Sequence, residues 1–298
     1  MVGVLALDGL KKRYGEVVAL DGCRLRVRPG RMVGFLGPNG AGKTSAMRAV
    51  FGLLRIDAGT VLWNDRPVTQ AERRRFGYMP EVRGLYPRMK VRDQIVYLGR
   101  LHRMDKGSAS EAADRWLSRA GLQDRAGARL EELSHGNQQR AQLVAALVHD
   151  PELLVLDEPF SGLDPLGVEE MAGILRQRAD EGVAVLFSSH QLDLVEGLCD
   201  DVAIINRGRV VLEGEVGGLK DRSRRRRLDV DTDAPLRLLR GIQGARILRS
   251  RGTRHTLVIP TGTDVRELLG SLPQEVRIRE FSYRPPTLSD LFKEAVGP

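Results

Sequence analysis

The chain contains 298 residues, which allows one large hydrophobic core or one core with a small second domain. Its hydrophobic fraction of 42% is typical of soluble globular proteins, and no stretch approaches the roughly 18 consecutive apolar residues of a membrane span. The first residues lack the charged and apolar pattern of a signal peptide. The net charge of +8 permits contact with nucleic acid or with an anionic membrane and does not choose between them. The two cysteines, Cys23 and Cys199, match no metal-binding or redox spacing, which favours a reducing compartment.

The first 36 residues predict strands. Residues 4–36 alternate between apolar and polar side chains, with turn signals at 14–16 and 29–30, which indicates an antiparallel sheet. Residues 31–36 form an apolar run typical of a buried strand. Tyr14 precedes the first turn, where its ring can stack on a base, although an aromatic residue at a hairpin more often serves packing.

Eight residues then match the phosphate-binding loop G-x-x-x-x-G-K-[ST]: Gly37, Pro38, Asn39, Gly40, Ala41, Gly42, Lys43 and Thr44. The glycines let the backbone adopt positive φ and approach a ligand closely, so that successive N–H groups can surround an anion. A helix expected from residue 45 adds the positive end of its dipole. Lys43 supplies a point charge for the outer phosphates, and Thr44 supplies a hydroxyl for Mg²⁺.

A chance match is the alternative, and two observations count against it. The flanking strand and helix are the context that this loop requires. Only seven of the 47 basic residues are Lys, yet the chain keeps Lys at position 43, where a compact ammonium suits the phosphates better than a planar guanidinium.

The following residues predict a helical insertion. Residues 59–63 and 75–79 are expected to be strands, and residues 91–149 carry helical periodicity with breaks at Gly107 and 121–127. The sequence therefore predicts a helical subdomain over about 82–149, inserted into a body that contains the sheet.

The sheet is expected to resume at residues 153–156, an apolar run that ends in Asp157 and Glu158. Ligands bind at the carboxyl ends of parallel strands, so Asp157 is predicted to bind Mg²⁺ beside the phosphate-binding loop. Glu158 should point to the other side and is free to polarise a water molecule. Two ordinary surface acids are the alternative. A second buried strand at 183–187 leads to His190, which can contact the γ-phosphate, although a hydrogen-bonded core histidine is the commoner case.

The remaining residues predict a helix, a hairpin and a small second domain. The helix is expected at 167–179 and the hairpin at 202–212. A boundary is expected near residue 220, with a charged linker at 221–227 whose arginine run favours a solvated surface. The rest, 228–298, is predicted to be a small α+β domain, with strands at 245–248, 256–259 and 276–281 and helices at 265–269 and 288–296.

Taken together, these motifs resemble the ATP-binding subunit of an ABC transporter over residues 4 to about 220. The resemblance implies an α/β fold of the P-loop NTPase class, with a mixed, mainly parallel core sheet, an antiparallel β subdomain and the helical insertion. It also implies that ATP and Mg²⁺ are the ligands. Leu153 to Asp157 match the Walker B motif, with Glu158 as the catalytic carboxylate and His190 as the switch histidine.

Three further motifs match that family. Glu81 lies at the Q-loop, where it is an expected Mg²⁺ ligand together with Thr44 and Asp157. Residues 133–139 match the signature motif and residues 161–164 match the D-loop. The nucleotide-binding residues implied outside the phosphate-binding loop itself are Tyr14, Ser45, Ser134, Gly136 and Asp164.

Two departures from the family pattern stand out. The signature reads LSHGN instead of LSGGQ, and it retains Ser134 and Gly136. The Q-loop residue is Glu81 instead of Gln, and its carboxylate changes the charge near Mg²⁺ by one unit while remaining an oxygen ligand. Both departures, and the segment 281–288, resemble the bacterial export branch that includes sodium-extrusion and antibiotic-export ATPases.

The resemblance also implies partners. The family works as a head-to-tail dimer of nucleotide-binding domains, whose second member is another copy of the chain or a paralogue. It acts with a separate transmembrane permease at the cytoplasmic face of the membrane. No nucleic acid is expected. The rival is a soluble ABC-type ATPase that acts on a ribosome or on DNA, which the basic charge favours weakly. Translation-type relatives carry two such domains and DNA-repair relatives a long coiled coil, whereas this chain has one Walker A motif and no sustained heptads.

Overall fold

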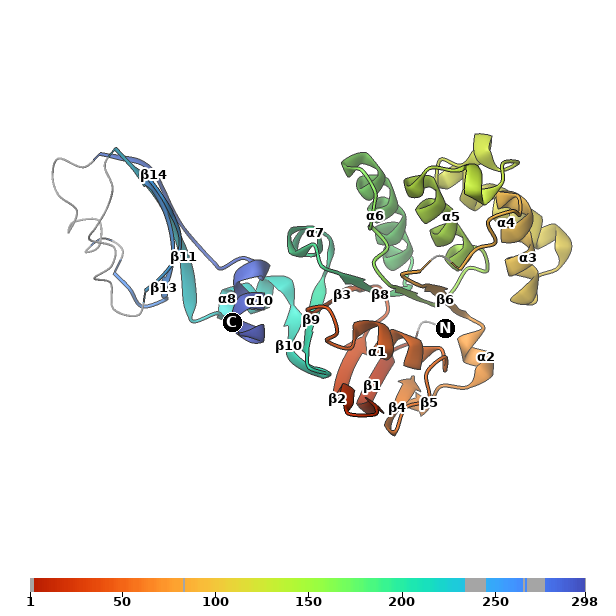
Figure 1. Ribbon diagram of the computed structural model, residues 1–298, viewed down its shortest axis with the longest axis horizontal. Coiled ribbons are helices and arrows are strands. Elements are labelled where there is room, and N and C mark those ends of the chain that lie inside the picture. Colours follow the sequence, from red (N-terminus) through yellow and green to blue (C-terminus); the bar gives the residue numbers. More distant parts are fainter. Residues whose placement is uncertain (1–2, 83, 234–244, 265, 267–276, 298) are drawn as a thin grey trace. The chain divides into compact units, whose positions relative to one another are not determined.

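The computed structural model describes residues 3–82, 84–233, 245–264, 266 and 277–297. The chain divides into two compact units, residues 1–214 and residues 215–298, and each unit is described by itself (Figure 1). The division precedes the predicted boundary near residue 220, because the helix α8 (Val216–Arg222) belongs to the second unit.

The first unit contains a six-stranded sheet in the order β10-β9-β3-β8-β7-β6. Its strands are β3 (Met32–Leu36), β6 (Phe76–Met79), β7 (Leu153–Leu156), β8 (Ala184–Ser189), β9 (Asp201–Asn206) and β10 (Arg209–Glu215). β3 is parallel to β8 and β9, and β7 is parallel to β6 and β8. Every residue of β3, β7 and β8 is buried, which explains their nearly continuous apolar sequences. The carboxyl ends of these strands therefore gather along one edge of the sheet.

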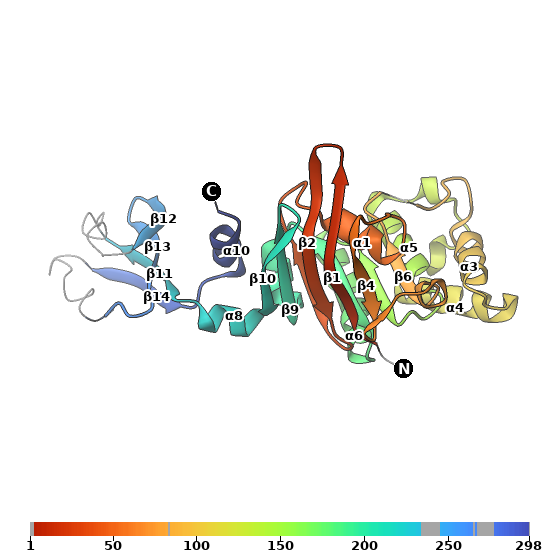
Figure 2. The same cartoon turned by 90° about the horizontal axis from the view of Figure 1, so that it is seen from below.

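A second sheet in this unit is antiparallel and has the order β2-β1-β4-β5. Its strands are β1 (Leu5–Tyr14), β2 (Val17–Val27), β4 (Ala58–Trp63) and β5 (Arg66–Pro67) (Figures 1 and 2). The predicted antiparallel sheet over 4–36 is therefore correct for β1 and β2, whereas β3 joins the parallel sheet. One core connects the two sheets, since Trp63 and Phe76 lie with ring centroids 4.8 Å apart and both are buried.

The helices of this unit are α1 (Lys43–Val50), α2 (Gln70–Arg73), α3 (Val91–Leu101), α4 (Lys106–Arg119), α5 (His135–Leu147), α6 (Pro165–Asp180) and α7 (Leu192–Leu198). Two short 3₁₀ helices, Gln123–Arg125 and Leu130–Glu132, separate α4 from α5. Figure 1 shows α3, α4 and α5 together, as the predicted helical insertion requires. The predicted break at Gly107 is wrong, because Asp105 caps α4 by accepting from the Ser108 N–H and Gly107 lies inside the first turn.

The second unit contains a four-stranded antiparallel sheet in the order β12-β13-β11-β14, together with α8 and α10 (Leu288–Val296). Its strands are β11 (Arg225–Thr232), β12 (Arg246–Arg251), β13 (Arg254–Pro260) and β14 (Ile278–Arg284). The charged linker predicted at 221–227 is wrong, because α8 extends through Arg222 and β11 begins at Arg225. The helix predicted at 265–269 lies outside the described residues except for residue 266.

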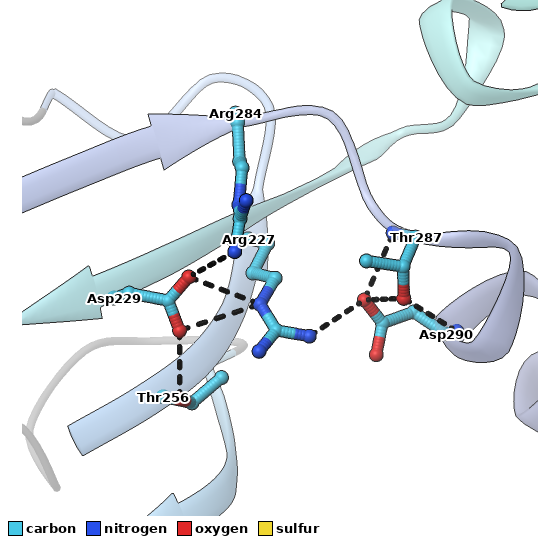
Figure 3. Close-up of polar contacts among 6 residues, drawn as sticks. All are labelled: Arg227, Asp229, Thr256, Arg284, Thr287 and Asp290. Atoms are coloured by element: carbon cyan, nitrogen blue, oxygen red, sulfur yellow. Dashed lines mark hydrogen bonds and ion pairs between the residues drawn. The ribbon is translucent and has the colours of Figure 1, made fainter. Parts of the chain in front are cut away.

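Charge pairing explains why an arginine-rich segment forms a strand. Leu228 and Val230 are buried on one face of β11, while Asp229 lies on the other face and accepts hydrogen bonds from Thr256, Arg227 and Arg284 (Figure 3). Arg227 also pairs with Asp290, Nη1 to Oδ2 3.5 Å, and Asp290 forms the capping box of α10 with Thr287. This network connects the sheet to α10. An arginine whose charge is paired in this way can remain in a strand without the cost of an unpaired buried charge.

Candidate nucleotide-binding site

The phosphate-binding loop follows β3 and leads into α1, as the sequence predicts. Gly40 and Gly42 have φ values of +78° and +110°, which favour glycine. Two neighbouring carbonyl groups also exclude side chains from the loop. A Cβ at Gly37 would lie 2.4 Å from the Ile205 carbonyl oxygen, and one at Gly42 would lie 2.3 Å from that of Ala19. The loop backbone is therefore packed on the protein side and leaves its other side for a ligand.

Lys43 is the first residue of α1 and its side chain lies over the loop. Its Nζ donates to the carbonyl oxygens of Gly37, at 2.6 Å, and Pro38, at 3.2 Å. The ammonium is thus held near the N-terminus of α1, where the helix dipole is positive. A positive side chain and a helix N-terminus at one place form a strong site for phosphate groups.

A cavity of about 430 Å³ lies over this loop. Its lining joins the loop to the ends of two parallel strands, since Glu81 follows β6 and Asp157 and Glu158 follow β7. The complete lining is Val17, Ala19, Asn39, Gly40, Ala41, Gly42, Lys43, Thr44, Ser45, Glu81, Asp157 and Glu158. Sequence positions as distant as 17 and 158 thus meet in one hollow that contains a cation, backbone N–H groups and three carboxylates.

Asp157 is buried, with 1% of its surface exposed. Its Oδ1 accepts a hydrogen bond of 2.6 Å from the Ser188 hydroxyl, while its Oδ2 is buried with no hydrogen-bond partner. Burial raises the pKa of nearby Tyr78, and the negative charge of Asp157 raises it further. A buried carboxylate oxygen without a partner is expected to have an ion or a water molecule to satisfy it.

These donors fit a magnesium ion bound together with nucleotide phosphates. The Thr44 hydroxyl and the Asp157 and Glu81 carboxylates line the same cavity and offer the hard oxygen ligands that Mg²⁺ prefers. Among the residues that the structure describes, no group of three or more His, Cys, Asp or Glu side chains is arranged to hold a metal ion. A magnesium ion at this place would be held by the oxygen atoms of Thr44, Glu81 and Asp157 beside the nucleotide phosphates.

Glu158 combines an unusual backbone with a partnered carboxylate. Its φ is +52°, a conformation that residues other than glycine rarely adopt. Its Oε2 lies 2.9 Å from His190 Nδ1, and the Glu158 side chain is 14% exposed while that of His190 is 64% exposed. His190 does not line the cavity itself, and it reaches the cavity through this contact. A carboxylate that is partly shielded from water and touches a histidine at the cavity is suited to accept a proton.

Six of the predicted nucleotide-binding residues do not line the cavity: Gly37 and Pro38 at the start of the loop, and Tyr14, Ser134, Gly136 and Asp164 outside the loop. Tyr14 ends β1 with 51% of its surface exposed, and Lys12 Nζ lies 5.4 Å from its ring centroid. Ser134 caps α5 by accepting from the Asn137 N–H, and Asp164 caps α6 by accepting from the Gly167 N–H. Gly136 lies beside Leu163, where a Cβ would approach to 3.3 Å. The structure therefore places the signature residues next to the D-loop, outside the cavity of the same chain.

His135 of the signature motif lies in close contact with the D-loop. A Cβ at Gly162 would lie 2.5 Å from His135 Nδ1, and Gly162 has a φ of +74°. Glycine is therefore required at position 162 both by its backbone and by the histidine ring. The helix α5 begins at His135, with Ser134 as its N-cap.

Sequence reasoning missed four residues around this site. Val17 and Ala19 line the cavity, and Gln139 and Ser188 hold the backbone of Glu158. A serine at the end of an otherwise apolar strand is a signal that marks Ser188. Gln139 lies within the signature motif at 133–139, but its contact with Glu158, like the places of Val17 and Ala19 in the lining, comes from partners distant in the sequence.

The loop, the glycine contacts and the acidic strand ends define the class of P-loop nucleotide-binding proteins. Comparison with known proteins then gives the family. The ABC transporter family model matches residues 20–161, and a model described as "ATP-binding protein DrrA1-3-like, C-terminal domain" matches residues 214–296. The chain is 40% identical to the ABC transporter ATP-binding protein YhaQ of Bacillus subtilis (strain 168), over 99% of each chain. It belongs to the ATP-binding subunits of ABC transporters.

Two further likenesses agree with this assignment. The Nod factor export ATP-binding protein I of Paraburkholderia xenovorans (strain LB400) is 36% identical, over 72% of each chain. A solved structure of an ATP-binding subunit of an ABC transporter superposes with a TM-score of 0.68 at 26% identity, over 73% of this chain and 92% of that one. None of the helices in the described parts of the chain has the length and apolar character needed to cross a membrane.

Proposed function

We propose that this subunit hydrolyses Mg²⁺-bound ATP and thereby powers export of a small molecule or ion through a separate membrane permease. The observation that carries the proposal is the cavity that joins Lys43 and the phosphate-binding loop to Asp157 and Glu158. The loop and Lys43 bind the phosphates, while Thr44, Glu81 and Asp157 face the magnesium ion.

Glu158 is the general base of this proposed reaction. It accepts a proton from the water molecule that attacks the γ-phosphorus, the bond from that phosphorus to the bridging oxygen breaks, and ADP leaves with the electron pair. His190 supports this role, because its Nδ1 lies 2.9 Å from Glu158 Oε2 and its exposed ring can extend toward the γ-phosphate.

Replacing the base tests the proposal. Glu158→Gln keeps the size of the side chain and removes its ability to accept the proton, so ATP turnover is expected to fall by about 10²- to 10⁴-fold. ATP affinity, measured by calorimetry, should change little because the loop and Lys43 are intact. Turnover near that of the unmodified protein would overturn the assignment of Glu158.

A second copy of the nucleotide-binding unit completes the proposed site. Ser134 and Gly136 lie outside the cavity of their own chain, at the N-terminus of α5. Across a head-to-tail interface this N-terminus is suited to contact the γ-phosphate of ATP held by the other copy. Because Glu158→Gln retains ATP, it should sediment as a dimer with ATP and as a monomer with ADP. A mass that does not depend on the nucleotide would reject the composite site.

The permease, the export direction and the position at the cytoplasmic membrane face are part of the same proposal. The support is the full-length likeness to a transporter ATP-binding protein, the named Nod factor exporter and the matched C-terminal domain. The helical subdomain and the segment before it also expose apolar side chains, Val82, Tyr86, Tyr97 and Leu101, which suit contact with a partner. No comparison favours the rival, an ATPase that acts on ribosomes or DNA.

A further inference from the structure

Gln139 is a buried polar residue in α5, the helix whose N-terminus carries the signature motif. Only 4% of its surface is exposed. Its Nε2 donates to the carbonyl oxygens of Glu158, at 3.1 Å, and Pro159, at 3.0 Å. The contact spans 19 positions of sequence and joins α5 directly to the backbone of the proposed general base.

The other side of the Glu158 backbone is held as well. Its N–H donates to the Ser188 hydroxyl at 2.9 Å, and the same hydroxyl donates to Asp157 Oδ1 at 2.6 Å. Both backbone polar groups of Glu158 are therefore bonded to side chains of other elements, β8 on one side and α5 on the other. This explains how a non-glycine residue keeps a φ of +52°, since such conformations persist only where the surroundings determine them.

We infer that Gln139 is a positioning residue for Glu158. The inference rests on the proposed function, in which the Glu158 carboxylate accepts the proton. Gln139 lies about one helical turn from His135 and Gly136, so a movement of α5 when its N-terminus meets the second copy is transmitted to the Glu158 backbone. Through this hydrogen bond, the orientation of the Glu158 carboxylate depends on the position of α5 in the same chain.

A purely structural role is the alternative. In that case Gln139 only satisfies two buried carbonyl groups, and its loss lowers stability without a specific effect on catalysis. The two roles differ in their dependence on Glu158, because a positioning residue has nothing to position once the carboxylate is gone.

The first experiment replaces Gln139 by Met, which keeps a linear side chain and removes the donor. We expect kcat to fall by about 10- to 100-fold, because small misplacements of a reacting group cost about this much, while ATP affinity by calorimetry changes less than about twofold. His149→Phe is the matched control. It removes another hydrogen bond between a side chain and a backbone carbonyl, that of Phe76, which does not involve Glu158. Its turnover per folded molecule should stay within about twofold.

The second experiment repeats Gln139→Met in the Glu158→Gln background and gives the decisive comparison. Positioning predicts that the residual turnover is unchanged by the second substitution. A further loss as large as that in the unmodified background would overturn the inference, and so would an unchanged kcat for Gln139→Met alone. If Glu158→Gln itself kept full turnover, the proposed function would fail instead, so the two failures are distinguishable. Thermal unfolding of each variant identifies any variant that does not fold. If Gln139→Met does not fold, Gln139→Glu, which keeps the length of the side chain, replaces it, and its turnover is compared in the same two backgrounds.

Discussion

Individual residues of the phosphate-binding loop must fit both the surrounding protein and the cavity for the ligand. Gly42 faces the Ala19 carbonyl on one side and the cavity on the other, so a side chain at this position would collide with the protein before it met a ligand. Lys43 is held over the same loop by two carbonyl groups. The protein thus prepares both the shape and the charge of the site before a nucleotide arrives.

Removing the Lys43 charge gives a prediction at this scale. Lys43→Ala should weaken ATP binding by about 10- to 100-fold or more, because a hydrogen bond from a charged donor to phosphate contributes about 1.5–3 kcal/mol. Calorimetry with the isolated protein measures this loss. Lys106→Ala removes the same charge from an exposed position in α4 and serves as the control. Equal affinities of the two variants would contradict the role of Lys43.

The sequence predicts residues of this site where the chemistry is local. The loop residues are consecutive, and Asp157 and Glu158 end a strand that composition alone identifies. Gln139 and Ser188 could not be predicted as supports of Glu158, because hydrogen bonds over 19 and 30 positions depend on how α5 and β8 pack. The signature residues and Asp164 were assigned by resemblance, and their contact with a nucleotide remains a prediction.

At the scale of elements, burial decided which predictions were correct. β7 and β8 are buried apolar runs and were predicted within one or two residues of their bounds. β11 was missed because its arginines pointed to a linker, and only the facing acids and the buried Leu228 and Val230 make the segment a strand. Helix starts depended on caps such as Asp105, which a glycine-based rule overlooks.

The junction between the helical insertion and the sheet contains a pair of stacked histidines. The rings of His102 and His149 lie with centroids 3.6 Å apart, and His149 Nε2 contacts the Phe76 carbonyl of β6. Burial and, to a smaller extent, the charge of His102 together lower the pKa of His149 from its ordinary value of 6.5 to about 3. The folded protein therefore keeps His149 neutral over a pH range in which the unfolded chain binds a proton.

This shift predicts a pH dependence of stability. Well above pH 6.5, His149 is neutral in both the folded and the unfolded chain. Its protonation therefore does not lower the free energy of unfolding in that range. As the pH falls from 6.5 toward 3, only the unfolded state takes up the proton, and the free energy of unfolding decreases by up to about 1.4 kcal/mol per pH unit. Thermal unfolding between pH 7.5 and 5 measures the effect, with His149→Phe as reference. Parallel stability curves for the two proteins would contradict it.

At the scale of the whole molecule, the chain combines an ATP-binding unit with a C-terminal unit that matches a separate family model. The sequence predicts a boundary near residue 220, and the structure divides the chain after residue 214, with α8 in the second unit. Three quarters of the formal net charge belongs to residues 215–298, which carry +6 of the total +8. The ion pairs around Asp229 show that part of this charge holds the second unit together.

As proposed above, the chain is the ATP-driven subunit of a membrane exporter. The measurement that tests this most directly is the composition of the complex that copurifies with tagged Glu158→Gln from detergent-solubilised membranes in the presence of ATP. We predict a polytopic membrane protein in an amount comparable to that of the tagged chain. Ribosomal or DNA-bound material without any membrane protein would contradict the account.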